Sequence, residues 1–249
     1  YQRRFGRFSD FSIDFSYAKQ LFKDALPLVF SGMVVILYMK VDQVMIMNLM
    51  DDEAVGQYTA ALRSSEIWYF GGGLLTASLF PAIVNAKKHS EARYLKRLQH
   101  FYDLMVYVSI TIALPVTLLG PWLLQQDFLF GDAYQAAGPV LRIHVWTLVF
   151  VYLGVAASKQ LIAENLQKIE LYRTIFGAVI NMILNYFLIQ SHGIIGAAIA
   201  TLLSQAFASW LGYLISRKTW VVFRLQSRSL LFLSLLDRIR GKGSGLDMD

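Results

Sequence analysis

The chain has 249 residues, of which 56% are hydrophobic and 16% are charged, and its formal net charge is +6. This composition is too apolar for an ordinary soluble domain of the same length. The chain contains no cysteine, which excludes disulfides and thiolate chemistry. Because it begins at Tyr1 with a basic, aromatic segment rather than a signal peptide, we expect it to be the C-terminal part of a longer protein.

Six long apolar segments are predicted to be transmembrane helices, because each can cross about 30 Å of hydrocarbon at 1.5 Å per residue. They are residues 25–50, 57–85, 101–124, 139–162, 171–190 and 193–216. The sequence therefore predicts an all-α polytopic membrane protein. We divide it into a cytoplasmic connector (1–24), a six-helix transmembrane lobe (25–217) and a cytoplasmic amphipathic tail (218–249).

The basic residues alternate with these spans. All but three of the 23 Lys and Arg lie before the first span, after the second, around the fourth connection or after the last. The turn at Asp51–Glu53 and the loop at 125–138 contain no base. The positive-inside rule therefore places both ends of the chain and the 86–100 loop in the cytoplasm. Because the bases flank membrane spans, membrane lipids are their expected partners and nucleic acid is not.

Several local patterns predict details of the lobe. Pro81 and Pro115 lie inside the second and third spans and are predicted to kink them. The basic 86–100 loop is predicted to continue as a short interfacial helix. The apolar run that begins at Leu230 is too short to cross the bilayer, so we expect it on the inner membrane surface. The last span has a ridge of small residues that permits close helix packing: Gly196, Ala200, Ser204, Ala208 and Gly212.

Five of the charged residues inside or at the edge of the spans are the candidates for a site: Lys40, Asp42, Arg63, Glu66 and Arg142. A charge in hydrocarbon costs roughly 3 kcal/mol or more, so such groups face a partner or a water-filled cavity. Lys40 and Asp42 are about 200° apart around their helix, so at least one is expected to face a cavity. Glu66 could neutralise Arg63 at a separation of three. Arg142 could instead extend to the outer surface.

Three bases against two acids make the predicted lumen positive, which favours anions and phosphate in particular. We therefore assign Lys40, Arg63 and Arg142 to substrate binding. Asp42 and Glu66 are assigned to ion binding or charge pairing.

Asn181 and Asn185 share one stripe of the fifth span. They either join helices or line a polar lumen, and the sequence leaves both readings open. No catalytic constellation is present: the four histidines lack a second ligand at metal spacing, and Gly71–Gly73 follows no strand. The sequence therefore predicts a transporter rather than an enzyme, with no metal and no cofactor.

A set of motifs, in this order and spacing, resembles bacterial polysaccharide-unit flippases. The resemblance covers about residues 20–217, and the motifs are Pro27, Leu37–Ile46, Val55–Ala61, Pro81, Phe130–Tyr134 and His192–Thr201. On these residues the chain resembles the Wzx-like branch of the multidrug/oligosaccharidyl-lipid/polysaccharide exporter superfamily. Residues beyond 218 are outside the resemblance.

The resemblance implies twelve spans in two six-helix lobes around a central cavity, of which this chain supplies the C-terminal lobe. It further implies translocation of undecaprenyl-pyrophosphate-linked oligosaccharide, as in O-antigen and lipopolysaccharide biosynthesis, across the bacterial cytoplasmic (inner) membrane by alternating access. The expected partners are the lipid-linked oligosaccharide, the missing N-terminal lobe and the polysaccharide polymerase machinery.

Two other functions compete with this interpretation. A multidrug exporter of the same superfamily would favour a more acidic cavity for cationic substrates. A membrane-bound polysaccharide enzyme would need a long extramembrane loop or a His/Asp/Arg cluster at one surface, and the predicted outer loops are short. A purely structural bundle would not explain Lys40 and Asp42 inside a span.

Overall fold

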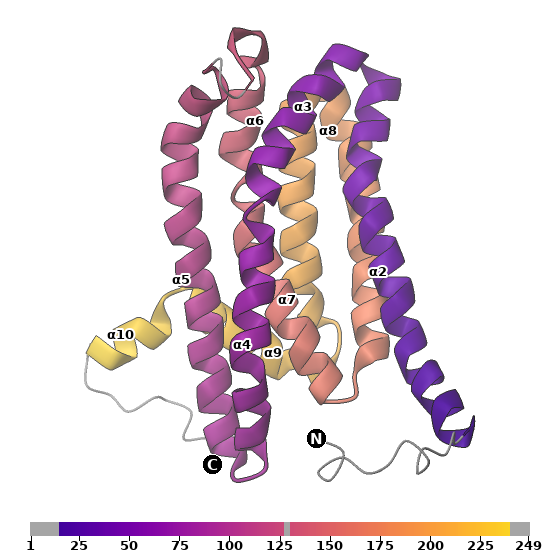
Figure 1. Cartoon of the computed structure of the whole chain (residues 1–249), viewed down its shortest axis with the longest axis vertical. Helices are drawn as coiled ribbons and strands as arrows, with labels where there is room; N and C mark the ends of the chain where they lie inside the picture. The colour runs from indigo at the N-terminus through magenta and orange to yellow at the C-terminus, as the bar shows by residue number, and fades with distance from the viewer. Residues whose placement is uncertain (1–14, 127–129, 240–249) are drawn as a thin grey trace, which may run out of the picture.

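The computed structural model describes residues 15–126 and 130–239, which contain helices and no strand (Figure 1). Predictions for residues 1–14 and 240–249 lie outside the described residues. The helices that make up the spans are α2 (Phe15–Leu49), α3 (Asp52–Glu66), α4 (Tyr69–Lys87), α5 (Glu91–Leu124), α6 (Ala137–His144), α7 (Thr147–Ala163) and α8 (Gln167–Ser209). Further helices are η2 (Asp132–Tyr134), η3 (Leu211–Leu214), η4 (Arg217–Thr219), α9 (Trp220–Leu230) and α10 (Leu233–Ile239). The chain is therefore an all-α, polytopic membrane protein fragment.

Four stretches of the described residues are long and apolar enough to cross a membrane: Asp52–Lys87, Glu91–Leu124, Ala137–Ala163 and Gln167–Leu214. The last of these folds back on itself at Gly193, whose φ of 58° lies in the left-handed region. Gly177 therefore meets Ala208 across the two arms, so closely that a Cβ on Gly177 would lie 2.6 Å from that of Ala208. The small-residue ridge predicted from the sequence thus packs one arm of α8 against the other.

Local sequence explains where several helices begin. Asp51 separates α2 from α3, and its carboxylate accepts a hydrogen bond of 2.8 Å from the backbone N–H of Ala54. Ser90 occupies the same position before α5. These are the residue types that satisfy the unpaired N–H groups of a first helical turn. The prediction of a short interfacial helix at 86–100 was wrong, because residues 91–100 are the first turns of the continuous helix α5.

Two of the spans contain a break, a two-residue turn that keeps right-handed helical φ and ψ, and neither break is at a proline. Helix α3 gives way to α4 at Ile67–Trp68, and α6 gives way to α7 at Val145–Trp146. Pro81 lies inside α4 and Pro115 inside α5, and both helices continue through them. The helix interruptions are therefore in the second and fourth spans, away from the prolines that the sequence singled out.

The breaks divide the bundle into two packed halves. Helices α3 and α6 pack on each other, as do α4 and α7. One hydrophobic core joins α3 and α6 to α2 and α8, with Ile46, Tyr58 and Leu141 fully buried. The other joins α4, α5, α7 and α9 around Tyr102 and Leu153. Each half of the second and fourth spans thus has its own core.

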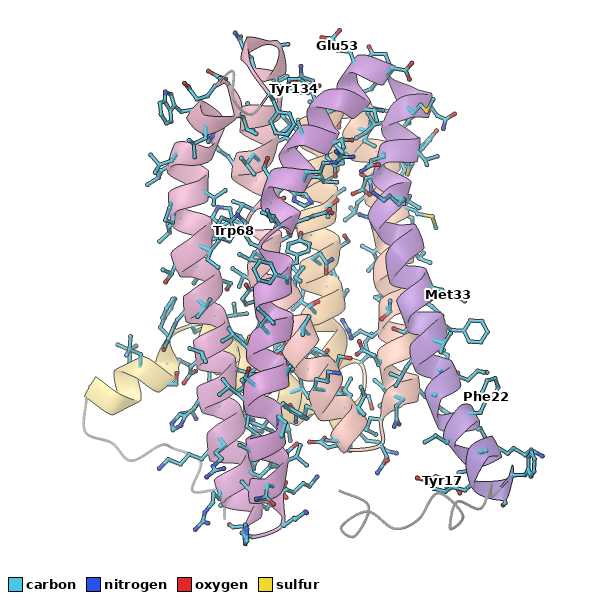
Figure 2. All side chains as sticks on the ribbon, in the orientation of Figure 1. Tyr17, Phe22, Met33, Glu53, Trp68 and Tyr134 are labelled. Atoms are coloured by element: carbon cyan, nitrogen blue, oxygen red, sulfur yellow. The ribbon has the colours of Figure 1, made fainter. Side chains whose placement is uncertain are left out.

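Helix α2 lies at the edge of the bundle and packs mainly on α8 (Figure 1). Its 35 residues would measure about 52 Å, and it starts ten residues before the predicted first span. Phe22 and Met33, labelled on α2 in Figure 2, are largely exposed. Such apolar exposure is expected for a surface that contacts lipid or another lobe.

The two ends of the bundle differ in charge. One end carries the α4–α5 turn, the α7–α8 turn and α9, and we call it the basic end because it holds Lys87, Lys88, Lys168, Arg217 and Lys218. The opposite end carries the α2–α3 turn with Asp51, Asp52 and Glu53 (Figure 2).

Candidate functional site

A buried carboxylate, that of Asp42, is the centre of the candidate site. It lies in α2 and is 3% exposed. Its Oδ2 accepts hydrogen bonds from the Thr201 hydroxyl at 2.5 Å and from the Tyr58 hydroxyl at 2.9 Å, and its Oδ1 accepts one from Asn185 Nδ2 at 2.6 Å. All three donors are neutral. Asp42 therefore holds α2 to α3 and to both arms of α8 through hydrogen bonds rather than through a basic partner.

Asn181 and Asn185 extend this cluster along α8. Asn185 Nδ2 also donates to Asn181 Oδ1 at 3.0 Å, and Asn181 Nδ2 donates to Ser204 Oγ at 3.2 Å. Both asparagines are 0% exposed. They join helices in this conformation and do not line an open lumen. We call Asp42, Tyr58, Asn181, Asn185 and Thr201 the Asp42 cluster.

One oxygen of the Asp42 cluster lacks a partner. Asn185 Oδ1 is buried and has no hydrogen-bond partner among the described residues. Leaving a buried acceptor unsatisfied costs about 1–3 kcal/mol, so such atoms commonly serve a ligand or an ion. The described residues hold no group of three His, Cys, Asp or Glu near one another. A cation at Asp42 would therefore be held by one carboxylate and by neutral oxygens, which suit hard ions.

The charged residues assigned to substrate binding have exposed side chains. Lys40, Arg63 and Arg142 form no hydrogen bond or ion pair with a described side chain. Lys40 lies about 14 Å along α2 from Leu49, so it is well inside the span. Arg142 lies near the end of α6, and no contact joins it to the other two bases among the described residues.

Arg63 does not form the ion pair with Glu66 that its spacing allowed: no N–O distance between these two described residues is within 4.0 Å. The charges that act on Glu66 are instead those of Lys40 and Asp42 on α2. The second span therefore presents its carboxylate towards the charged stretch of the first span.

The sequence analysis gave no role to Tyr58 or Thr201, although both lie in motifs that it singled out. Thr201 is separated from Asp42 by 159 positions. The available signal was the small-residue ridge of the last span, because Thr201 directly follows Ala200 of that ridge. Hydroxyls beside such ridges commonly bond across helices.

The two helix breaks lie side by side and are bridged by polar side chains. Ser65 Oγ and His144 Nδ1 are 2.7 Å apart; His144 immediately precedes its break, and Ser65 lies two residues before the other. On the other side of the breaks, the hydroxyls of Tyr69 and Thr147 are 2.6 Å apart. We call residues 65–69 and 144–147 the paired breaks. One bridge lies in each half of the bundle, and both join the second span to the fourth at the level of the breaks.

Gly71 and Gly72 leave the space in which Tyr152 packs against the paired breaks. The Tyr152 hydroxyl donates to the Trp68 carbonyl at 2.8 Å, where the helical hydrogen bonds are interrupted. A Cβ on Gly71 would lie 2.4 Å from that hydroxyl oxygen, and one on Gly72 would lie 3.0 Å from the ring. Gly73, the third member of the run, has open space around it.

Replacing Gly71 with Ala is therefore expected to lower the free energy of unfolding by about 1–3 kcal/mol, because the buried Tyr152 must move away from the Trp68 carbonyl. Gly73→Ala is the matched control and is expected to be neutral or slightly stabilising, because Ala is favoured over Gly inside helices. Thermal unfolding of the detergent-solubilised protein compares the two. Equal melting temperatures would contradict the packing described here.

A buried ion pair at the basic end fastens the two arms of α8. Arg173 Nη2 lies 2.6 Å from Glu170 Oε1, and Arg173 Nε donates to Glu170 Oε2 at 3.2 Å. Arg173 also donates to the Ala208 carbonyl and lies over the Tyr213 ring at 5.1 Å from its centroid. Because the guanidinium is engaged on every side, we interpret this pair as structural, although it borders a cavity of about 270 Å³.

The comparisons with known proteins agree with this architecture. The MatE family matches residues 27–187. A Haloferax volcanii protein described as a "probable low-salt glycan biosynthesis flippase" is 26% identical over 195 residues, which are 77% of this chain and 40% of that protein. The chain thus spans less than half the length of this relative. No solved structure matches. With most of its transmembrane lobe matched, the chain belongs to the MatE family.

Proposed function

We propose that this chain is the C-terminal lobe of a flippase that moves lipid-linked oligosaccharide across the membrane by alternating access. The observation that carries the proposal is the combination of exposed bases inside spans with a buried carboxylate that joins three helical segments. The glycan biosynthesis role in the relative's description supports a glycan-bearing substrate. The finer assignment to a Wzx-like flippase of undecaprenyl-pyrophosphate-linked units rests on the motif resemblance.

In this proposal the exposed bases hold the anionic part of the substrate. Lys40 and Arg63 lie on the first two spans, within the hydrocarbon depth, and neither forms an ion pair among the described residues, although the charge of Lys40 acts on Glu66. Phosphate is the natural counter-ion for such side chains, and Arg binds it in a fixed geometry. Arg142, on α6, would act closer to the membrane surface at the end of the bundle that carries Asp51–Glu53.

The Asp42 cluster is the proposed coupling site. A charged Asp42 makes charge-assisted hydrogen bonds with Tyr58, Thr201 and Asn185, which are stronger than bonds between neutral groups. A proton or a hard cation bound at the carboxylate would compete with these bonds and weaken the hold of α2 on α8. Binding at Asp42 would thereby change how firmly the first span is attached to the rest of the lobe.

The paired breaks supply a place where the lobe can bend. The halves α3–α6 and α4–α7 each have their own core, and within each half one polar bridge joins the second span to the fourth beside the breaks. A short stretch of i→i+3 hydrogen bonds inside a helix, such as Trp68 N–H to the Ser65 carbonyl and Trp146 N–H to the Ile143 carbonyl, often marks a functional hinge. We therefore place the bending point of the second and fourth spans at Ile67–Trp68 and Val145–Trp146.

The function is tested with the purified full-length protein in liposomes that contain a fluorescent lipid-linked oligosaccharide in both leaflets. A membrane-impermeant reagent that destroys the exposed sugar should reach the inner-leaflet pool only when the flippase is present and supplied with an ion gradient. An exporter of cationic drugs would instead expel a cationic dye and leave the lipid pool unchanged. That second result would contradict the proposed flippase function and would support a multidrug exporter instead.

We further propose that the basic end is cytoplasmic, following the positive-inside rule. Cysteines introduced at Asp52 and at Lys88 in the full-length protein should then react differently with an impermeant maleimide added to intact cells. Asp52→Cys is expected to be labelled, and Lys88→Cys is expected to react only after the membrane is permeabilised. Labelling of Lys88→Cys in intact cells would reverse the orientation.

A further inference from the structure

The segment that follows the last span forms an elbow at the basic end of the bundle. We call residues 217–236 the C-terminal elbow; they comprise η4, α9 and the first turn of α10. Figure 1 shows α9 behind the lower part of the bundle and α10 projecting sideways past α5. The elbow contains Arg217, Lys218, Arg224 and Arg228 and no acidic residue.

A polar contact fixes the inner side of the elbow to α5. Asp103 Oδ1 accepts hydrogen bonds from Ser229 Oγ at 2.8 Å and from Ser234 Oγ at 2.7 Å. Gln99 Nε2 donates to the same oxygen at 2.9 Å and to the Leu225 carbonyl at 3.1 Å. Because these groups are buried, they set the position and rotation of the elbow along the third span.

The polarity of the elbow beyond α9 is the reverse of that of a helix in water. The serine Ser234 is buried, whereas the neighbouring leucines are outside; Leu231 is 63% exposed. The exposed apolar residues of the elbow are Trp220, Val221, Leu231, Phe232, Leu233, Leu235 and Leu236. A surface helix of a soluble protein buries its apolar face, so this arrangement suits an apolar medium.

The charge of the elbow indicates which kind of apolar medium its exposed leucines contact. Four basic and no acidic side chains lie in the same twenty-residue segment as the exposed leucines, and Arg217, Lys218 and Arg224 are exposed. Basic residues beside an apolar face are typical of segments that lie in the plane of an anionic membrane surface. Trp220 begins α9, and tryptophan favours the level of the headgroups.

We propose that the C-terminal elbow is a binding surface for anionic lipid, seated in the membrane surface at the basic end. Its leucines contact the upper acyl chains, and the exposed side chains of Arg217 and Lys218 bind phosphate-bearing headgroups. The contact at Asp103 sets how deeply the elbow sits, because it ties the elbow to a helix that crosses the bilayer. This proposal does not depend on which substrate the protein transports.

The test uses the full-length protein in nanodiscs with one environment-sensitive label at Leu231→Cys, all cysteines outside this chain having been replaced. The discs contain phosphatidylcholine alone or mixed with phosphatidylglycerol, with or without a lipid-borne quencher. In the anionic discs we expect the lipid-borne quencher to quench the label. We expect a water-borne quencher to reach the label more slowly there than in phosphatidylcholine discs. A label at Leu118→Cys, on an exposed position of α5, should be quenched by lipid in both.

Arg217→Gln together with Lys218→Gln should reduce the preference for anionic discs by roughly tenfold, since each base contributes to attraction by the surface. Lys87→Gln with Lys88→Gln is the matched control: it removes the same charge at the same end but outside the elbow, and the preference should persist. A Leu231→Cys label that stays accessible to water in anionic discs would overturn the proposal. So would equal quenching in both lipids, or protection that depends on protein concentration, which would indicate a second copy.

Discussion

Asp42→Asn is expected to abolish transport, by at least about a hundredfold, while the protein remains folded in the membrane. Asn has nearly the same shape as Asp, and the hydroxyls of Tyr58 and Thr201 can rotate to accept a hydrogen bond instead of donating one. The variant thus keeps the packing of α2 on α8 and loses only the negative charge. The liposome assay, normalised to the amount of protein, measures the loss.

Tyr58→Phe is the companion variant, because it removes one of the three donors and leaves the charge of Asp42 in place. The free energy of unfolding should fall by at most about 1–3 kcal/mol, and transport should fall far less than in Asp42→Asn. If Asp42→Asn transports at the normal rate, the Asp42 cluster only joins helices and the coupling site must lie elsewhere. If Asp42→Asn is lost from the membrane, Asp42→Glu, which keeps the charge, separates folding from coupling: transport should survive in it.

Lys40→Ala and Lys40→Gln are expected to lose most transport, by about tenfold or more, whereas Lys40→Arg should retain much of it. The side chain is exposed about 14 Å from the end of α2 and forms no hydrogen bond or ion pair with a described residue, so its charge can act on an anionic substrate as well as on Glu66. Replacement by Arg keeps that charge. Protein abundance in the membrane should be similar in all three variants.

Lys23→Ala is the matched control, because Lys23 is an exposed base on the same helix near its basic end. Its replacement should leave transport unchanged. A purely structural Lys40 would behave differently: Lys40→Ala would lower abundance, and the remaining protein would transport normally. Unchanged normalised export in Lys40→Ala would remove this residue from the proposed substrate site.

Hydropathy and charge could be read from the sequence because they depend on local composition. The six predicted spans correspond to α2, α3–α4, α5, α6–α7 and the two arms of α8, and the all-α polytopic class is confirmed. The reversal at Gly193 also follows local chemistry, since a left-handed φ favours glycine. The family, in its coarser form, is likewise confirmed by the match over residues 27–187.

The tertiary structure decided which polar groups meet, because that depends on how each helix is rotated about its axis. Spacing allowed Arg63 to pair with Glu66, yet no ion pair forms between these described residues, and Asp42 takes neutral donors from α3 and α8 instead. The helix breaks at Ile67–Trp68 and Val145–Trp146 carry no proline, so no local signal marks them. At the first break the Trp68 carbonyl accepts the Gly71 N–H three residues on and also the Tyr152 hydroxyl, and this second bond is one that only the packed bundle can provide.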